Sequence, residues 1–101
     1  LPEAQEKGLS GRKSLNEDQG MLFVFYKSEI YPFWMKDMNF AIDIIWIDED
    51  FRVVFIKKNA STQSYPETFT PNQNARYVLE GSAGFSEKNN LKVGDFRKRI
   101  I

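Results

Sequence analysis

The chain has 101 residues, enough for one domain with one hydrophobic core. Its 14 basic and 14 acidic residues cancel, so no net charge attracts it to nucleic acid. It has no Cys and no His, which excludes disulfides, thiolate metal sites and a Ser-His-Asp triad made by this chain alone. No apolar run approaches the roughly 20 residues of a membrane span. We therefore expect no cofactor, no metal, no nucleic-acid partner and no transmembrane segment.

The first half of the sequence predicts a short helix and three strands. Residues 2–9 indicate a helix, since a Pro and two Glu residues stand at its start. The apolar run 21–25 predicts a strand buried on both faces, and 33–36 predicts a second short strand. Residues 41–47 predict a central strand, because both of its alternating faces are apolar except at Asp43.

The second half predicts a hairpin, a long polar segment and further short elements. Residues 48–51 read as the turn that leads into a strand at 52–56. Residues 57–74 form an 18-residue polar segment, and structureless segments of that length are often functional. Three more elements follow: a strand at 75–80, one or two helical turns within 81–90 with Ser82 as N-cap, and a last strand at 96–101.

This pattern predicts a mainly β fold. Several short strands follow one another without the crossover helices that a parallel sheet needs, so we expect antiparallel pairing. The predicted architecture is a single domain over residues 1–101, an antiparallel β-sandwich or a barrel-like, jelly-roll-like fold with two short helices.

The most informative polar residue is Asp43, a carboxylate inside an apolar strand. A buried carboxylate requires a charged partner or several hydrogen bonds. Asp43 is therefore a candidate general base or cation ligand, or else a structural group satisfied by Arg12, Lys36 or backbone donors. Glu80 is the candidate second carboxylate of a glycosidase-like pair, which needs about 5 to 10 Å between the carboxyls. The alternative for Glu80 is an ordinary solvated strand end.

The remaining candidates are basic and aromatic. Arg12 follows a glycine and offers either an anion site or a structural pair with an acidic residue. Trp34, Tyr65 and Tyr77 are candidates for an aromatic surface that binds sugar or peptide, and the alternative for each is core packing. Lys36 is a candidate cross-strand partner of Asp43.

Six segments in order resemble one family, the domain-of-unknown-function family 192. They are 8–12 (GLSGR), 20–25 (GMLFVF), 33–36 (FWMK), 42–45 (IDII), 75–80 (ARYVLE) and 92–95 (KVGD). The resemblance implies a small β-sandwich or barrel-like domain, often exported in bacteria, which favours an extracytoplasmic location. It implies no established activity.

Two departures from the family pattern, and the absence of an initiator Met, carry expectations. The family shows a strand before the first helix, whereas this chain starts at the helix, so we expect it to lack an N-terminal strand or leader. It does not begin with Met, which suggests a processed or trimmed product. Phe51 stands where the family has Gly, so either Phe51 is strained or the turn differs.

Two functional hypotheses follow. The first is a non-catalytic binding or accessory module with a groove near Trp34, Lys36, Asp43 and Tyr77, roofed by the segment 57–74 and open to a small molecule, a glycan or a protein. It is favoured because no complete catalytic constellation is present. The alternative is a small glycosidase-like hydrolase that uses Asp43 and Glu80. A purely structural role for each of these residues is a third reading.

Overall fold

A computed structural model of the chain describes residues 9–16 and 19–97. The centre of the fold is the strand β3 (Ile42–Ile47). β3 pairs antiparallel with β4 (Val53–Ala60) on one side and with β6 (Ala75–Ser82) on the other. All six residues of β3 are buried, as expected for a strand that is apolar on both faces. The prediction of a central strand here is confirmed.

The fourth strand of this sheet is β1 (Gly20–Glu29), which pairs with β6 and lies at the edge of the order β1-β6-β3-β4. The alternating residues Phe23 and Phe25 are buried, but Val24 between them is half-exposed. The prediction of a strand buried on both faces is therefore wrong at this position. β1 is an edge strand, and only one of its two faces is well covered.

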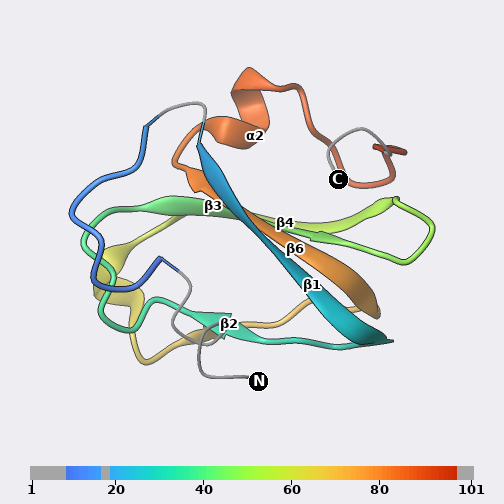
Figure 1. Cartoon of the computed structure of the whole chain (residues 1–101), viewed down its shortest axis with the longest axis horizontal. Helices are drawn as coiled ribbons and strands as arrows, with labels where there is room; N and C mark the ends of the chain where they lie inside the picture. Colours follow the sequence, from blue (N-terminus) through green and yellow to red (C-terminus); the bar gives the residue numbers. More distant parts are fainter. Residues whose placement is uncertain (1–8, 17–18, 98–101) are drawn as a thin grey trace.

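Different elements cover the two faces of the four-stranded sheet (Figure 1). A small antiparallel sheet of β2 (Phe33–Trp34) and β5 (Thr68–Phe69) packs on what we call the inner face. The short helix α2 (Phe85–Lys88) packs on the opposite, outer face. Two unequal antiparallel sheets enclosing a core confirm the predicted mainly β, sandwich-like fold class.

The larger core cluster lies between the two sheets and is rich in aromatic rings. Phe33 of β2 meets Trp46 of β3 edge-to-face, with 5.8 Å between ring centroids. The indole N–H of Trp46 donates to the Tyr31 carbonyl at 2.8 Å, so the buried ring has no unsatisfied polar atom. These contacts hold β2 firmly against the inner face.

The segment 57–74 is more ordered than predicted. β4 continues to Ala60, and the 3-10 helix η1 (Thr62–Ser64) follows, capped by the Ser61 hydroxyl, which accepts from the Gln63 N–H at 3.1 Å. β5 then pairs with β2. The polar composition concealed these elements because most of their side chains face solvent.

The predictions at 2–9, 81–90 and 96–101 have different outcomes in the structure. The helix predicted at 2–9 lies outside the described residues except for Leu9, which is in a turn. The short helix predicted within 81–90 is present, but Gly84, not Ser82, is its N-cap. Of the predicted strand 96–101, Phe96 forms a single antiparallel bridge with Arg52, and residues 98–101 are outside the described part.

The β3–β4 turn contains a strained residue, as the substitution of Phe51 for the family's Gly suggested. Phe51 has φ +65°, in the left-handed region that disfavours bulky side chains. Its ring stacks on Tyr77, with 5.4 Å between centroids and 16° between planes. The stacking on Tyr77 offsets part of the strain.

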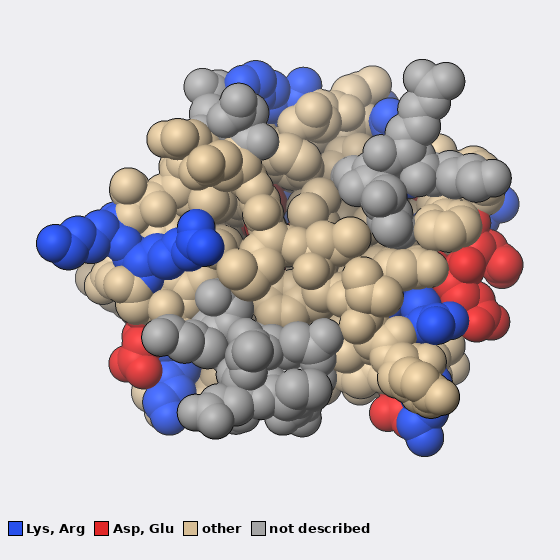
Figure 2. Space-filling model, viewed as in Figure 1, with Lys and Arg blue, Asp and Glu red and all other residues tan. Residues whose placement is uncertain are grey.

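Charged residues are dispersed on the surface. On the face in Figure 2, Lys, Arg, Asp and Glu lie around the margin, and uncharged residues fill much of the middle. No helix within the described residues is long and apolar enough to cross a membrane.

Candidate functional site

Asp43 points to the outer face of the sheet. Its neighbour across β6 is Gly81, which leaves room for Phe85 of α2. The Asp43 side chain has no exposed surface. The carboxylate is therefore enclosed between the sheet and α2, and it must be satisfied from within the protein.

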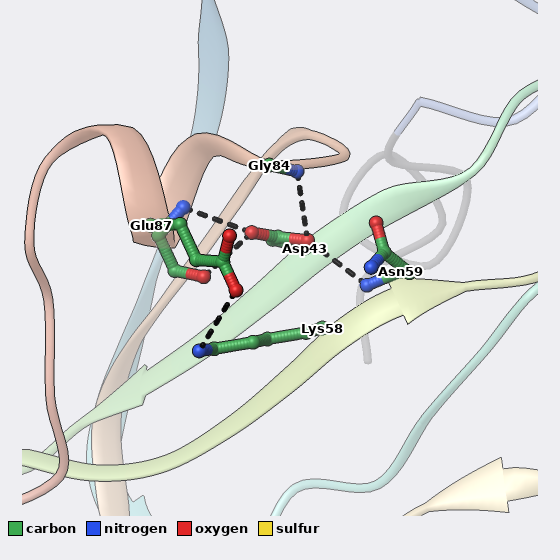
Figure 3. A network of polar contacts seen from close by, with 6 residues as sticks. Asp43, Lys58, Asn59, Gly84 and Glu87 are labelled. Atoms are coloured by element: carbon green, nitrogen blue, oxygen red, sulfur yellow. Dashed lines mark hydrogen bonds and ion pairs between the residues drawn. The ribbon is translucent and has the colours of Figure 1, made fainter.

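Four hydrogen bonds satisfy this carboxylate (Figure 3). Oδ1 accepts from the backbone N–H of Asn59 at 3.0 Å and of Gly84 at 3.3 Å. Oδ2 accepts from the backbone N–H of Ser86 at 2.8 Å and from the Ser86 hydroxyl at 2.7 Å. No described basic side chain forms an ion pair with Asp43.

The local backbone is shaped to supply these donors. The register of β3 and β4 shifts between Ile42 and Ile44, which marks a β-bulge opposite Asp43. Asn59 in that bulge has φ +51°, and its N–H turns toward the carboxylate. Gly84 and Ser86 lie at the start of α2, where N–H groups lack helical partners. Asp43 thus caps a helix from a remote strand.

Burial raises the pKa of Asp43, but the hydrogen bonds from Asn59, Ser86 and Gly84 together outweigh it and hold the pKa below its ordinary value. Asp43 is an ionised, fully hydrogen-bonded structural carboxylate. Of the partners suggested by the sequence, the backbone donors are correct. Arg12 and Lys36 are both exposed, and neither contacts Asp43, so the predicted Lys36–Asp43 pair is wrong.

Glu80 lies on the opposite side of the sheet. It is opposite Ile44, whereas Asp43 is opposite Gly81, and successive residues in a strand point to opposite faces. Glu80 therefore faces the inner core, and the sheet separates it from Asp43. The two carboxyls cannot share a substrate, so the predicted glycosidase-like pair is not formed.

Glu80 is also not the solvated strand end that was the alternative. Only 4% of the residue is exposed, and its Oε1 atom has no hydrogen-bond partner among the described residues. Burial raises the pKa of Glu80 to about 7, and a hydrogen bond from the Leu9 N–H opposes this rise. On β6, Glu80 therefore holds its proton to about pH 7. The next residue, Gly81, lies opposite Asp43, whose carboxylate is ionised.

Three of the predicted binding residues meet on the surface of the β2–β5 sheet. Trp34 and Tyr65 remain 36% and 44% exposed, with 5.1 Å between their ring centroids. The Lys36 Nζ lies over the Trp34 ring, 5.7 Å from its centroid. We call Trp34, Lys36 and Tyr65 the Trp34 surface.

The other two members of the predicted groove lie elsewhere. Asp43 is under α2, and Tyr77 packs with the outer-face core and stacks on Phe51. The predicted groove joining Trp34 and Lys36 to Asp43 and Tyr77 is therefore wrong, because the four-stranded sheet divides it. Arg12 is exposed, and its carbonyl accepts from the Asn39 side chain at 2.8 Å.

Sequence reasoning missed Ser86, which is fully buried and supplies two of the donors to Asp43. A Ser two residues after Gly84, at the start of a helix, was the available signal. The bulge at Asn59 has no such signal, because its amide serves Asp43 only through the β3–β4 register.

A family model with the description "Uncharacterized ACR", for the domain-of-unknown-function family 192 (DUF192), matches residues 1–97. The chain belongs to this family. Two curated relatives are the UPF0127 protein of Thermococcus gammatolerans and the UPF0127 protein PH1112 of Pyrococcus horikoshii. The first is 32% identical over 85 residues, 79% of this chain and 51% of the relative. The second is 32% identical over 68 residues, 67% of this chain and 53% of the relative. The chain thus spans about half the length of these relatives.

Two crystal structures have closely similar folds. One is a protein of Sinorhizobium meliloti provisionally described as a transcription regulator, with TM-score 0.88 and 30% identity over 95% of this chain and 74% of that one. The other is a protein of unknown function from Novosphingobium aromaticivorans, with TM-score 0.86 and 31% identity over 95% of this chain and 68% of that one. These similarities place the DUF192 chain in a known fold whose biochemical role is open.

Proposed function

We propose that this chain is a non-catalytic binding module whose ligand contacts the Trp34 surface. The observation that carries the proposal is the meeting of two half-exposed aromatic rings with one ammonium group. Large aromatic side chains with an apolar face and a polar edge are typical of binding surfaces, where they contribute much of the affinity.

The Trp34 surface is held on a firm base. In the β2–β5 pair, Phe33 lies opposite Phe69 and Trp34 lies opposite Thr68. The two Phe side chains are buried in the core, so the alternating position of Trp34 faces away from it. A surface positioned in this way loses little conformational freedom on binding.

The chemistry of the surface favours a ligand with an apolar face and a negative charge. An indole and a phenol ring can stack against the C–H face of a pyranose. Lys36 forms no ion pair with a described carboxylate, so its ammonium is available to an acidic group on the ligand. We therefore assign the ligand to the acidic oligosaccharides.

The hydrolase alternative has less support. All four hydrogen bonds of the Asp43 carboxylate are internal, and Glu80 is on the other face of the sheet. Glycoside hydrolysis by paired carboxylates requires two such groups beside one glycosidic bond.

The experiment is a binding titration with purified uronic-acid oligosaccharides and neutral oligosaccharides of equal length. Trp34→Ala is expected to weaken binding of an acidic member about 30-fold, as for an interface hot spot. Lys36→Gln is expected to remove the preference for acidic over neutral sugars.

The matched control is Tyr26→Ala, which removes an aromatic ring that is 96% exposed on β1. This variant is expected to bind as the original chain does. Absence of binding throughout the panel, or equal losses in Tyr26→Ala and Trp34→Ala with folding intact, would contradict the proposal.

A further inference from the structure

The segment Leu9–Arg12 is fastened to the domain at two places. At one end, Leu9 is 1% exposed, and its N–H donates to the Glu80 carboxyl. Farther along, the Ser10 hydroxyl donates to the Lys36 carbonyl at 2.7 Å, and the Gly11 N–H donates to the Asp37 carbonyl at 2.9 Å. The segment therefore connects a buried carboxyl to the turn that carries Lys36.

In the described part of the chain, the Leu9 N–H is the one hydrogen-bond donor to the Glu80 carboxyl. On the inner face it is flanked by Met21 of β1 and Ile44 of β3, which are both uncharged. Beyond Ile44, Lys57 of β4 faces the same side, but its Nζ lies over the Phe69 ring, 4.9 Å from the centroid. Within residues 9–16 and 19–97, the Glu80 Oε1 atom has no hydrogen-bond partner.

The other segments near Glu80 also carry charged groups, and none of these forms an ion pair with it. They are Arg12 on the Leu9–Arg12 segment and Lys36 and Asp37 on the turn, all exposed. Within the described chain, no ion pair offsets the burial of this carboxyl.

We propose that Glu80 is a proton-sensitive latch: in its neutral form it lets Leu9–Arg12 stay packed on the inner face, and its ionisation favours release of that segment. The geometric basis is a carboxyl with one unpartnered buried oxygen, covered from outside the sheet by a turn residue. A buried carboxylate with one hydrogen bond gains solvation when that cover is removed.

The direction of the effect follows from proton linkage. The pKa of Glu80 is about 7 in the closed state, against its ordinary 4.5 when exposed. Above pH 4.5 the open state loses its proton first, so rising pH shifts the equilibrium toward opening until about pH 7. A difference of about 2.5 units corresponds to a shift of up to about 300-fold.

Release would also affect the turn beside the Trp34 surface. Opening breaks the bonds to the Lys36 and Asp37 carbonyls, so it frees the backbone that positions Lys36. This consequence for ligand binding rests on the proposed function, whereas the latch itself does not, and its test requires no ligand.

The test is amide hydrogen exchange between pH 5 and 8.5, expressed as protection factors corrected for the intrinsic pH dependence. Protection of the Gly11 N–H is expected to fall by up to about 75-fold between pH 5 and 8.5, while β3 amides retain a higher opening free energy. Glu80→Gln is expected to make Gly11 protection independent of pH. The matched control, Glu49→Gln at an exposed position, is expected to behave as the original chain does.

A pH-independent Gly11 protection in the original chain would overturn the proposal. So would equal opening free energies at Gly11 and in β3, because Glu80 would then act only on global unfolding. If Glu80→Gln fails to fold, the carbon-13 carboxyl signal of Glu80 in the original chain decides. Its titration midpoint is expected near pH 7, where the fall in Gly11 protection levels off, and a midpoint near 4.5 would contradict the latch.

Discussion

Replacing Asp43 with Asn tests whether this carboxylate is the structural centre of the outer face. The substitution keeps the size of the side chain but removes its charge and exchanges one acceptor oxygen for an NH2 group. With the amide oxygen on the Ser86 side, the NH2 faces the Asn59 and Gly84 N–H groups. In the other orientation it faces the Ser86 N–H. At least one buried donor is left without an acceptor in either case.

The expected loss follows from these contacts. An unsatisfied buried donor costs about 1–3 kcal/mol, and loss of charge from the remaining hydrogen bonds adds about 1 kcal/mol. We therefore expect Asp43→Asn to reduce the free energy of unfolding by about 3 kcal/mol at pH 7. For a domain of this size, that corresponds to a fall in the melting temperature of about 12–24 °C.

The loss should depend on pH in a defined direction. The pKa of Asp43 in the folded chain is below its ordinary 3.8, so its stabilisation is present above pH 3.8 and is lost as pH falls through the folded value. The difference between the original chain and Asp43→Asn should thus narrow in acid.

Urea denaturation from pH 2 to 7 measures this difference, with Asp50→Asn at an exposed turn position as the matched control. An unchanged midpoint at pH 7, or a loss that stays constant down to pH 2, would refute the structural role.

Two further substitutions test the packing on each face of the sheet. Glu80→Gln should raise the free energy of unfolding at pH 8 by up to about 3 kcal/mol, because the folded chain holds the Glu80 proton to about pH 7 and the unfolded chain releases it near 4.5. Urea denaturation should then show that the fall in stability between pH 4.5 and 7 is absent in this variant, and a fall that persists would contradict the role of Glu80. Gly81→Ala should lower stability by about 1–3 kcal/mol, because the new Cβ would lie 2.9 Å from Phe85 Cγ and displace that ring. A melting temperature equal to that of the original chain would show that α2 does not pack tightly there.

The fold was predictable where hydrophobic pattern alone decides it. Apart from Asp43, residues 41–47 are apolar on both faces, and only the centre of a covered sheet buries both. The same reasoning failed at 21–25, because an edge strand can carry apolar residues on its exposed face, as Val24 does. It also failed within 57–74, where exposed side chains hide β4's second half and β5.

The sequence identified the candidate site residues but did not show how they lie relative to one another. That Asp43 must be satisfied follows from its apolar context. Which groups satisfy it depends on a bulge at Asn59 and on a helix start 43 residues along the chain, at Ser86. The separation of Asp43 from Glu80 depends on the β3–β6 register, which opposes Asp43 to Gly81 and so turns Glu80 to the other face. No local pattern encodes that register.

The two tryptophans provide the most direct measurement of the proposed binding surface. A two-dimensional NMR titration with a uronic-acid oligosaccharide follows both indole N–H signals in one experiment. The Trp46 indole is buried and donates to the Tyr31 carbonyl, so its signal serves as an internal reference. We predict that the Trp34 indole signal and the Lys36 and Tyr65 amides shift together and saturate, while the Trp46 signal stays in place. Saturable shifts elsewhere on the chain with the Trp34 signal unmoved would contradict the Trp34 surface as the binding site.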